Sequence, residues 1–422
     1  MTEAGVAVER ALVRAGVAAG ERVAAVVRDP SLELTLLDVL PRLGIGFFPL
    51  DPDLPQTAVD VLLQRAGVRW VIRDGPLLDR HRGRFVGRDD GPRLLLATSG
   101  TEGGPRVLAF TRARLDASAA AVSRALGFTA ADRWLLCLPL HHVAGVQVVN
   151  RCRLVGARLE TALPFRAAEV LERIAAGAVT HLSLVPTQLW RLLEADPAFR
   201  PPSDLRAVLL GGGAAPPDLV ARAVAAGWPL WLGYGLTEAG ATVALERAEA
   251  DHPPGRVGRP LPHLSVVVRS RRIHLGGESL AEGWVTAQGV LPLAADDGLY
   301  ATGDLGRMDE RGRLWVEGRV DDLIVSGGVK VRPEVVEGML MRCPGVREVA
   351  VIGRPDPEWG ARVVACYAGE WPEARVAAWV RERLCGAHRP AEYRRLAALP
   401  RNAMGKIVRR ALRDVFQFPS GP

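Results

Sequence analysis

Short apolar runs alternate with amphipathic segments through the central part of the chain, between Val68 and Trp231. Compact apolar runs are typical of buried strands, and apolar positions with a period near 3.6 are typical of helices. The predicted strands are 68–72, 93–97, 134–138, 181–185, 205–210 and 229–232, and the predicted helices are 112–126, 166–176, 187–194 and 217–226. Gly127 follows one of these helices and is the residue type that commonly ends a helix. Strands that alternate with helices indicate a parallel sheet with helices on both faces.

The pattern changes after Glu246, where short β-type runs are separated by glycine and proline. These runs lie at 265–269, 273–275 and 314–317, and they predict a small β subdomain. The predicted architecture is therefore α/β, with a large N-terminal domain of layered sheets that includes this subdomain.

A second, smaller unit is predicted after Arg319. Its apolar pattern gives helices at 333–341 and 373–384 and strands at 346–352 and 362–367. Such a compact α+β unit of about a hundred residues has a common size for a small domain. We place the boundary at Val320–Asp321, which gives an N-terminal domain, 1–320, hinged to a C-terminal α+β domain, 321–422.

Composition narrows the class of protein. The 422 residues suggest two or three domains, and 48% hydrophobic with 24% charged residues are ordinary values for a globular protein. These values exclude a disordered chain, a collagen or a small disulfide scaffold. The five cysteines are odd in number and form no C-x-x-C pair, which favours a reducing cytoplasm. The N-terminus lacks the apolar segment of a secretory signal peptide.

Charge indicates small-molecule partners. The net charge is +7, and only Lys330 and Lys406 among the 54 basic residues are lysines. No basic stripe with interleaved aromatic residues occurs, so we expect no nucleic-acid partner. No stretch of 18 apolar residues occurs, so we expect no membrane span. The sequence leaves the oligomeric state open, a homo-oligomer included.

A loop rich in hydroxyls and glycines follows the predicted strand 93–97. Residues 98–106 read Thr-Ser-Gly-Thr-Glu-Gly-Gly-Pro-Arg. Glycines let backbone N–H groups approach a phosphate, hydroxyls add donors, and Arg106 can pair with a phosphate through two hydrogen bonds. The loop is not a Walker A motif. Its local composition equally fits a flexible surface loop.

Two further segments carry groups suited to a nucleotide. Residues 233–238 read Gly-Tyr-Gly-Leu-Thr-Glu, so Tyr234 could stack on a base while Thr237 and Glu238 hold phosphate and Mg²⁺. A turn with helix-capping threonine and glutamate fits the same letters. Asp304 lies in a glycine-bounded segment, 300–306, where a carboxylate can accept two hydrogen bonds from ribose hydroxyls. A simple Asx-turn fits that segment too.

The two lysines of the chain both lie in glycine-containing loops of the predicted small domain, 326–333 and 400–407. Arginine serves elsewhere as the surface cation, and a compact ammonium cannot be exchanged freely for a planar guanidinium. Chance placement of two residues remains an alternative to a selected role.

In this order, the segments resemble those of the adenylate-forming superfamily of acyl-CoA synthetases, adenylation domains and luciferases. The matching segments are the phosphate loop at 98–106, the Tyr-Gly-x-Thr-Glu motif at 234–238, the ribose aspartate at 302–306, the hinge and glycine-rich loop at 318–330, and the lysine loop at 405–406. The resemblance extends from about residue 90 to the C-terminus. Within the superfamily, residues 132–145, 179–193 and 208–216 most resemble the o-succinylbenzoate–CoA ligases of menaquinone biosynthesis.

The resemblance implies an ATP- and Mg²⁺-dependent acid–CoA ligase with coenzyme A as co-substrate. Lys406 would bridge the acyl carboxylate and the α-phosphate, Glu238 would hold Mg²⁺, and Thr237 would contact the α-phosphate. The implied ATP contacts are Thr98, Ser99, Gly100 and Thr101 with Arg106 beside them at the phosphates, Asp304 and Arg319 at the ribose, and Gly213, Ala214 and Tyr234 at the adenine.

The resemblance further implies that the small domain swings about Asp321 between two half-reactions. It would present Lys406 for adenylation, and then the loop of Gly327, Gly328 and Lys330 to CoA. His142 would border the acyl pocket, although a histidine at the edge of the core is an alternative reading.

Three departures from the superfamily pattern stand out. The phosphate loop has Glu102 and Arg106 where a threonine and a lysine are usual, and His141 replaces the usual phenylalanine before His142. The N-terminal part is short, so its first subdomain is expected to be trimmed. Three alternatives stay open: a synthetase for another fatty or aryl acid, a free-standing adenylation domain, and a non-catalytic nucleotide-binding relative.

Overall fold

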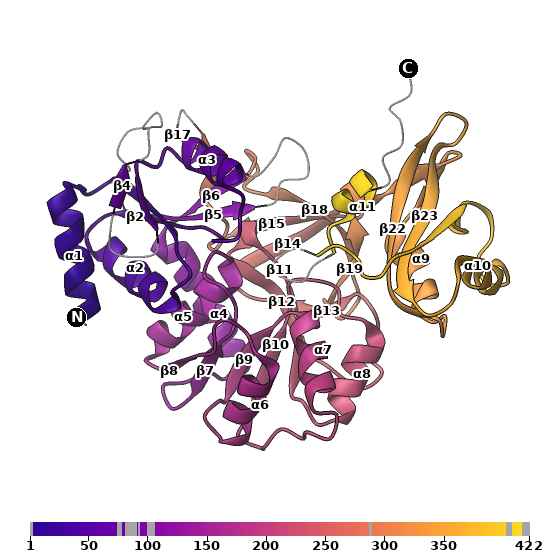
Figure 1. Ribbon diagram of the computed structural model, residues 1–422, viewed down its shortest axis with the longest axis horizontal. Helices are drawn as coiled ribbons and strands as arrows, with labels where there is room; N and C mark the ends of the chain where they lie inside the picture. Colours follow the sequence, from indigo (N-terminus) through magenta and orange to yellow (C-terminus); the bar gives the residue numbers. More distant parts are fainter. Residues whose placement is uncertain are drawn as a thin grey trace. The chain divides into compact units, whose positions relative to one another are not determined.

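The computed structural model describes residues 3–73, 78–80, 91, 93–98, 106–286, 289–401 and 407–415. The chain divides into two compact units (Figure 1). The first unit comprises Met1–Val267, His274–Ala301 and Asp309–Leu314, and the second comprises Val268–Ile273, Thr302–Met308 and Trp315–Pro422. No helix in this described part of the chain has the length and apolar composition needed to cross a bilayer.

The first unit begins with an eight-stranded sheet in the order β17-β16-β6-β5-β2-β1-β3-β4. Its strands are β1 (Arg22–Val26), β2 (Gly46–Pro49), β3 (Trp70–Arg73), β4 (Leu78–Arg80), β5 (Leu94–Thr98), β6 (Arg106–Phe110), β16 (Gly283–Thr286) and β17 (Gly289–Pro292). Helices α1 (Glu3–Ala15), α2 (Pro30–Arg42) and α3 (Gln56–Arg65) connect or precede the first strands. Strand β1 runs parallel to both β2 and β3, so this N-terminal part is itself a small α/β layer.

The second sheet of the first unit carries the elements that the apolar pattern predicted. Its strands in this unit follow the order β13-β12-β11-β10-β9-β7-β8, and β8, β7, β9, β10 and β11 run parallel. Their bounds are β7 (Arg133–Leu136), β8 (Arg158–Thr161), β9 (His181–Leu184), β10 (Ala207–Leu210), β11 (Leu230–Leu236), β12 (Ala241–Arg247) and β13 (Arg256–Pro260). The helices are α4 (Arg112–Leu126), α5 (Val143–Val155), α6 (Ala167–Ala175), α7 (Pro186–Ala195) and α8 (Pro217–Ala225).

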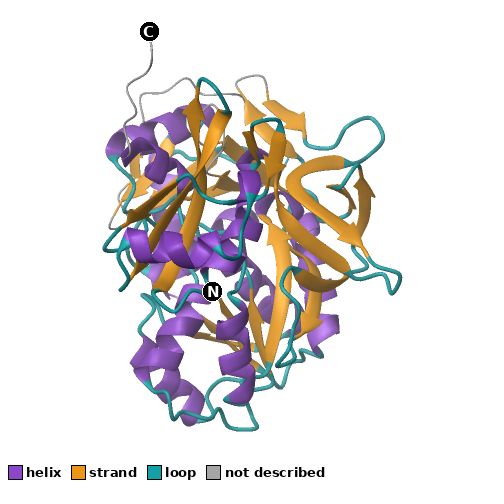
Figure 2. Ribbon diagram, turned by 90° about the vertical axis from the view of Figure 1, so that its right-hand side faces the viewer, coloured by secondary structure: helices purple, strands orange, loops and turns teal. Residues whose placement is uncertain are grey.

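Helices cover both faces of this sheet, as the alternation of strands and helices predicts (Figure 2). Successive residues of a strand point to opposite faces. Val208 and Leu210 of β10 accordingly lie in one apolar cluster with α6, α7 and α8, whereas Ala207 and Leu209 lie in another with α4 and α5. Each face buries its own core, which leaves the strand ends free to carry polar loops.

Several elements of the first unit differ from the prediction or were not predicted, among them β8, β12, β13 and the elements before Val68. Strand β11 continues through Leu236 instead of ending at Leu232, because it pairs with β12 as an antiparallel partner. Helix α5 and strand β6 were not predicted. Gly127 ends α4 in the left-handed conformation, with φ of 62°, as its position predicts.

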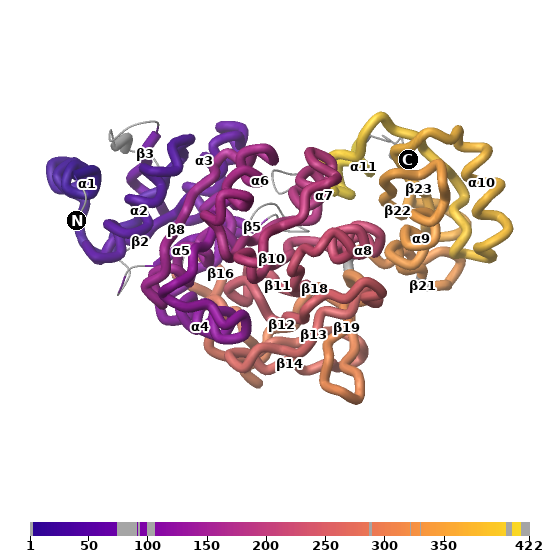
Figure 3. The backbone as a smooth tube through the Cα atoms, turned by 90° about the horizontal axis from the view of Figure 1, so that it is seen from below, coloured from indigo at the N-terminus to yellow at the C-terminus, as the bar shows by residue number. Residues whose placement is uncertain are grey.

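The second unit is built on a sheet in the order β21-β20-β23-β22, with β24 parallel to β23 (Figure 3). Its elements are β20 (Ile324–Ser326), β21 (Val329–Val331), α9 (Pro333–Leu340), β22 (Val346–Asp356), β23 (Gly360–Gly369), α10 (Glu373–Arg381), β24 (Glu392–Arg395) and α11 (Arg409–Val415). Val336 of α9 and Val376 of α10 share one buried cluster with Val351 and Val363 of the sheet. The unit therefore has its own core.

The short β-type runs that predicted a β subdomain form β14 (Leu264–Arg269), β15 (Arg272–Gly277), β18 (Tyr300–Met308) and β19 (Leu314–Arg319). Residues 268–273, 302–308 and 315–319 of these strands belong to the second unit. The second unit thus includes residues on the N-terminal side of the predicted boundary at 320.

Candidate functional site

The carboxyl ends of the parallel strands β7, β9, β10 and β11 meet at one edge of the second sheet. Ligands of open α/β sheets bind at this edge, outside the strand ends. The segments that emerge there are 137–142 after β7, 185–186 after β9, 211–216 after β10 and 237–240 after β11. Three of the segments that carry predicted site residues, those with His142, Gly213 and Thr237, are therefore brought to the same edge.

Strand β11 positions the Tyr-Gly-x-Thr-Glu motif through an irregularity in its pairing with β12. The register shifts between Tyr234 and Gly235, and Tyr234 is buried. A Cβ atom on Gly235 would lie far inside the contact distance of the Ala241 carbonyl oxygen, so only glycine fits this close approach. Tyr234 and Gly235 thus lie on a strand rather than in a loop after it, which corrects the sequence prediction.

Thr237 and Glu238 form a single 3₁₀ turn, η1 (Thr237–Ala239), that follows β11 directly. Gly240 closes the turn in the left-handed conformation, and its N–H donates to the Thr237 carbonyl at 3.0 Å. Both side chains are half-buried. A hydroxyl and a carboxylate therefore follow one another at the carboxyl end of β11.

Donors from distant segments fix this turn. The backbone N–H of Ala281 donates to the Glu238 carbonyl at 2.8 Å, and the Ser279 hydroxyl donates to the Ala239 carbonyl at 2.8 Å. The Gln147 amide donates to the Gly240 carbonyl at 2.8 Å. Sequence analysis did not identify Gln147 or Ser279 as site residues. The signal for Gln147 is its complete burial on α5, and it appears only once that helix is known.

Glu238 is the expected Mg²⁺ ligand, and its surroundings indicate which kind of metal site it suits. Among the described residues, no three or more histidine, cysteine, aspartate or glutamate side chains are grouped to hold a metal. A single half-buried carboxylate at a strand end suits Mg²⁺, because this ion usually keeps several waters and takes its other ligands from substrate phosphates. Glu238 therefore fits a cation that arrives with a nucleotide, and not a resident metal.

His141 and His142 occupy the turn between β7 and α5. Their ring centroids lie 4.5 Å apart, and the Nε2 atoms of both rings are buried without a hydrogen-bond partner. Burial, with the neighbouring His141 ring, lowers the pKa of His142 to about 3. Burial also lowers the pKa of His141, although Asp51 opposes this from 4.0 Å. The lowered pKa values favour the neutral form of both rings at pH 7.

A tight backbone contact shapes this histidine turn. The Gly145 N–H donates to the His142 carbonyl at 3.0 Å. A Cβ atom on Gly145 would clash with the carbonyl oxygens of Leu138 and Pro139. Glycine is therefore required for α5 to begin so close to the end of β7, and this start sets the position of His142.

The predicted phosphate loop begins and ends on adjacent strands. Thr98 is the last residue of β5 and pairs in register with Arg106, the first residue of β6. Ser99, Gly100, Thr101 and Glu102 lie outside the described residues. The exposed Arg106 guanidinium lies 5.3 Å from the ring centroid of Trp284, which holds it by a cation–π contact. The two described ends are thus those of a hairpin loop.

Two of the three predicted adenine contacts are accessible, whereas the third, Tyr234, is buried. Gly213 and Ala214 are exposed in the loop between β10 and α8, and a Cβ atom on Gly213 would meet nothing within 4 Å. The loop can therefore accept a flat ring against its backbone without rearrangement.

The second unit holds the predicted ribose group. Asp304 is buried on β18, and its carboxylate accepts a hydrogen bond from the Arg319 guanidinium at 3.1 Å. The Thr302 hydroxyl accepts from the Asp304 backbone N–H at 3.0 Å and donates to the Ile273 carbonyl at 2.8 Å. The two predicted ribose residues are therefore brought together, with Arg319 neutralising the buried carboxylate.

The other predicted residues of the second unit lie in its loops. Gly327 and Gly328 form the left-handed turn between β20 and β21, with φ of 55° and 79°. Asp321 lies in the 3₁₀ turn η2 (Val320–Asp322), and Lys330 lies on β21; their side chains lie outside what the structure describes. Lys406 also lies outside the described residues. The segment that contains it is flanked by a β-bridge between Arg401 and Ile407.

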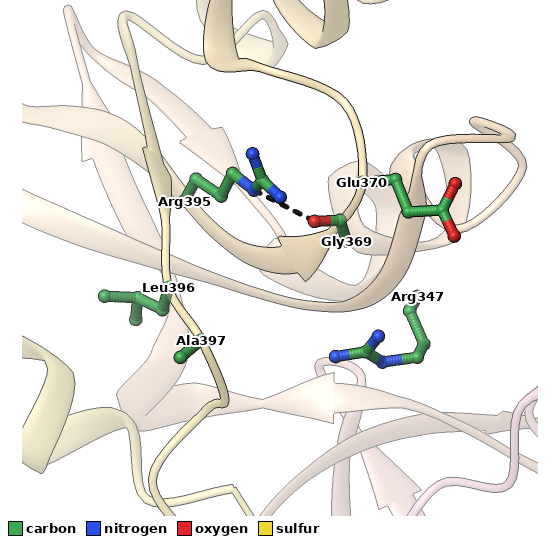
Figure 4. A pocket seen from close by; sticks show the side chains of 6 residues that line it. All are labelled: Arg347, Gly369, Glu370, Arg395, Leu396 and Ala397. Carbon is green, nitrogen blue, oxygen red and sulfur yellow. Dashed lines mark hydrogen bonds between the residues drawn. The ribbon is translucent and has the colours of Figure 1, made fainter.

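A separate cavity of about 500 Å³ lies at the end of the sheet in the second unit (Figure 4). Its lining residues are Arg347, Gly369, Glu370, Arg395, Leu396 and Ala397. The Arg395 guanidinium donates to the Gly369 carbonyl at 2.9 Å. None of the residues predicted for the site lines this cavity, so the predicted chemistry lies elsewhere.

Two family descriptions match the sequence. Residues 87–274 match "AMP-binding enzyme", and residues 335–406 match "AMP-binding enzyme C-terminal domain". The 2-succinylbenzoate–CoA ligase of Salmonella typhimurium is 35% identical over 389 residues, which span 89% of this chain and 83% of the relative. The Escherichia coli enzyme of the same name is 35% identical over 388 residues, with the same coverage.

Solved structures give the same result. The o-succinylbenzoate CoA synthetase of Bacillus subtilis in complex with the acyl-adenylate intermediate OSB-AMP matches with a TM-score of 0.87 and 27% identity, over 97% of this chain and 92% of that one. The same enzyme with ATP and magnesium matches with a TM-score of 0.85 and 26% identity, over 97% and 93%. The comparisons confirm the resemblance to adenylate-forming enzymes and the α/β fold class.

Proposed function

The chain belongs to the family of AMP-binding enzymes, and from this premise we propose that it is an ATP-dependent o-succinylbenzoate–CoA ligase of menaquinone biosynthesis. In the first half-reaction a carboxylate oxygen of the acid attacks the α-phosphorus of ATP. The bond to the β-phosphate breaks, and acyl-AMP and pyrophosphate form. In the second, the CoA sulfur attacks the acyl carbon after its thiol proton is lost, and AMP leaves with the bonding electrons.

One observation carries the proposal. The relatives that match nearly the whole chain at about one-third identity share one activity, ligation of 2-succinylbenzoate to CoA. The turn of Thr237 and Glu238 at the sheet edge supplies the chemistry such an activity needs. A carboxylate is a poor electrophile, and adenylation gives it a good leaving group, so the protein's task is to neutralise charge at phosphate and carbonyl.

We propose these roles in adenylation for the residues of the first unit. Glu238 holds Mg²⁺, which neutralises phosphate charge when it is bound with ATP, and Thr237 donates to the α-phosphate. Tyr234 and the loop of Gly213 and Ala214 flank the adenine. His142 borders the acyl group as a neutral donor or acceptor.

The phosphate loop has a matching proposed role. Thr98, Ser99, Gly100 and Thr101 bind the β- and γ-phosphates, with Arg106 at the end of the loop. The in-register pair of Thr98 and Arg106 supports this proposal, because it brings the two ends of the loop together.

We propose that the part of the second unit after the hinge, residues 321–422, takes up two alternating arrangements, whereas Asp304 and Arg319 precede the hinge. Asp304 and Arg319 bind the ribose, and Lys406 bridges the acyl carboxylate and the α-phosphate during adenylation. Rotation about Asp321, at a boundary between domains 1–320 and 321–422, then brings the loop of Gly327, Gly328 and Lys330 to CoA. The turn η2 at 320–322 supports this proposal, since hinges absorb their backbone changes at a few terminal residues of elements. We place the enzyme in the cytoplasm, where ATP and CoA are available.

The test is pyrophosphate release with ATP and Mg²⁺ over a panel of acids, with and without CoA. We expect release with o-succinylbenzoate, and a CoA thioester only when CoA is added. Benzoate, a long-chain fatty acid and malonate serve as controls for the aryl group, the acyl chain and a second carboxylate. Brisk release with the fatty acid and none with o-succinylbenzoate would refute the substrate and keep the reaction class. No release with any acid would favour a non-catalytic nucleotide-binding protein.

A further inference from the structure

Arg409, the first residue of α11, joins three segments of the second unit. Its guanidinium donates to both carboxylate oxygens of Glu337 on α9, at 2.8 and 2.9 Å, and to the Asp322 carboxylate at 3.3 Å. Glu337 in turn accepts from the backbone N–H of Val351 on β22 at 2.7 Å. The contact therefore links the C-terminal helix, the helix α9 and the sheet to the last residue of the η2 turn.

The position of this contact in the sequence makes it notable. Arg409 comes three residues after Lys406, and Asp322 comes one residue after Asp321, the proposed pivot. One side chain therefore connects the chain just after the proposed catalytic lysine to the chain just after the proposed hinge.

The contact is shielded from solvent. The side chain of Arg409 is 21% exposed, and those of Glu337 and Asp322 are 15% exposed. Exposed ion pairs contribute little, because water and salt screen them. The Nη2 atom of Arg409 contacts both oxygens of Glu337 and its Nη1 atom contacts Asp322, so the planar guanidinium bridges two carboxylates in a geometry that the single nitrogen of a lysine cannot reproduce.

Arg409 also balances a local excess of negative charge. Glu334 faces the same cluster, and burial together with the charges of Glu337 and Asp322 raises its pKa, while Arg409 opposes the rise. Arg413 adds a longer contact to Asp322, at 3.9 Å. Loss of Arg409 would leave Glu337 without a described cation and Asp322 with the longer contact to Arg413.

The other end of the lysine-containing segment is anchored as well. The Arg401 guanidinium pairs with the Glu348 carboxylate on β22 at 3.1 Å, and Arg401 forms a β-bridge with Ile407. The Val408 N–H donates to the Pro400 carbonyl at 2.9 Å. Arg401, before the segment that contains Lys406, is thus held by the sheet, and Arg409, after it, is held by Glu337 and Asp322. Of these two anchors, the one at Arg409 contacts the residue next to the proposed pivot.

We infer that Arg409 is a positioning residue for adenylation: it fixes the exit of the Lys406 segment to the lid side of the hinge, so that hinge rotation and the placement of Lys406 occur together. The inference rests on the proposed function, because it takes the roles of Lys406 and Asp321 from there. A displacement of about 1 Å in a reacting group can cost roughly a hundredfold in rate. Loss of the anchor should therefore reduce the step that uses Lys406 and spare the step that does not.

The experiment compares Arg409→Gln, Arg409→Lys and Arg410→Gln in both half-reactions. Arg410 is the exposed neighbour on the same helix, so its variant removes the same charge without the anchor. We expect Arg409→Gln to slow acyl-AMP formation about 10- to 100-fold, with the KM for ATP and thioester formation from supplied acyl-AMP changed less than about threefold. Arg409→Lys should recover only part of the rate, and Arg410→Gln should match the wild type.

A double variant separates positioning from stability. Glu337→Gln in the Arg409→Gln background removes the unpaired carboxylate, so it should restore the melting temperature without restoring acyl-AMP formation. Recovery of both would mean that Arg409 serves folding alone, and parallel slowing of both half-reactions would also overturn the inference. The Lys406→Ala variant is measured beside them with the acid that the panel identifies. It shows whether a negative result concerns the proposed function of Lys406 or the inference about Arg409. If it leaves adenylation intact, the proposed function of Lys406 fails. If it abolishes adenylation while Arg409→Gln remains at wild-type rates, only this inference fails.

Discussion

The two units treat buried polar groups in different ways. The first unit buries histidines in neutral form: burial lowers the pKa of His181 and His263 to about 4 and that of His142 to about 3. The second unit has a single histidine among its described residues, His388, and it is half-buried. Its shielded charges are paired, as at Arg409 and Glu337 or at Arg319 and Asp304. The first unit pairs some of its buried charges too, such as Asp132 with Arg206.

The difference matches a division of labour. A site among neutral groups has a low local dielectric, so a few donors and one cation act strongly on phosphate charge there. The part of the second unit after the proposed pivot, residues 321–422, keeps its own pair of Arg409 and Glu337 when it rotates, whereas Asp304 and Arg319 precede the pivot. This part also carries both lysines of the chain. Under the proposed function, residues after Asp321 would therefore bring their lysines to the site without breaking the pair of Arg409 and Glu337.

The largest expected effect tests whether the second unit supplies the cation for one step only. Lys406→Ala should slow acyl-AMP formation about 10²–10³-fold, as for loss of one preorganised charge donor. It should spare thioester formation from supplied acyl-AMP and CoA. Single-turnover assays of the two half-reactions measure both rates. Equal slowing of both would break the comparison, because the second unit would then act in a single arrangement.

The Asp321→Pro variant should have the opposite effect on the two half-reactions. Proline fixes φ near −65° and should restrict the hinge. We expect adenylation to remain within about threefold while thioester formation slows by at least about tenfold, since only the second step needs the rotation. An enzyme with both rates unchanged would show that residue 321 is not the pivot.

The next effect tests the burial of neutral groups in the first unit. Burial raises the pKa of Glu33, in the first turn of α2, from its ordinary 4.5 to about 7. The folded protein holds this proton more tightly than the unfolded chain, so the free energy of unfolding falls as pH rises from 4.5 to 7. Glu33→Gln removes this dependence and should stabilise the protein by roughly 2–3 kcal/mol above pH 7 and by little near pH 4.5.

Urea unfolding at pH 4.5 and pH 8 measures this difference. Glu172→Gln, an exposed glutamate on α6, is the control and should change stability by less than about 0.5 kcal/mol at either pH. A Glu33→Gln effect of the same size at both pH values would mean that the carboxylate is charged and solvated in the folded state.

The smallest effect concerns the paired charges of the second unit. Asp304→Asn keeps the size of the side chain but loses charge-assisted acceptance from ribose hydroxyls, worth roughly 1.5–3 kcal/mol. The affinity for ATP should fall about ten- to a hundredfold, with Arg319 left without its carboxylate partner. ATP titration by calorimetry measures the affinity. An unchanged affinity would mean that Asp304 only completes a turn with Thr302.

Most of the second sheet could be predicted because each of its strands and helices shows a single period of hydrophobic residues. Helix α4, from Arg112 to Leu126 with Gly127 after it, occurs as predicted, since periodicity and a local stop signal agree. The extension of β11 was missed because it depends on pairing with β12 and on the close approach of Gly235 to Ala241. No local pattern contains either contact.

The candidate site shows the same limit. Thr237 and Glu238 could be identified from a motif, and the structure brings them to the edge that carries His142 and Gly213. Gln147 could not be identified from the sequence, because its amide donates to the carbonyl of Gly240, 93 positions away. The roles of Lys406 and of the loop that contains Ser99 stay predictions, since these residues lie outside those described.

The pinned turn after β11 has a consequence for the entropy of ligand binding. Three consecutive carbonyls, those of Glu238, Ala239 and Gly240, are each held by a donor from another segment of the first unit. Fixing the backbone of a residue costs about 1–2 kcal/mol, and here folding has already met that cost. A nucleotide that binds at Thr237 and Glu238 therefore meets a surface already in place. The ordering penalty of binding, and any slow step before it, must arise in other segments of the chain.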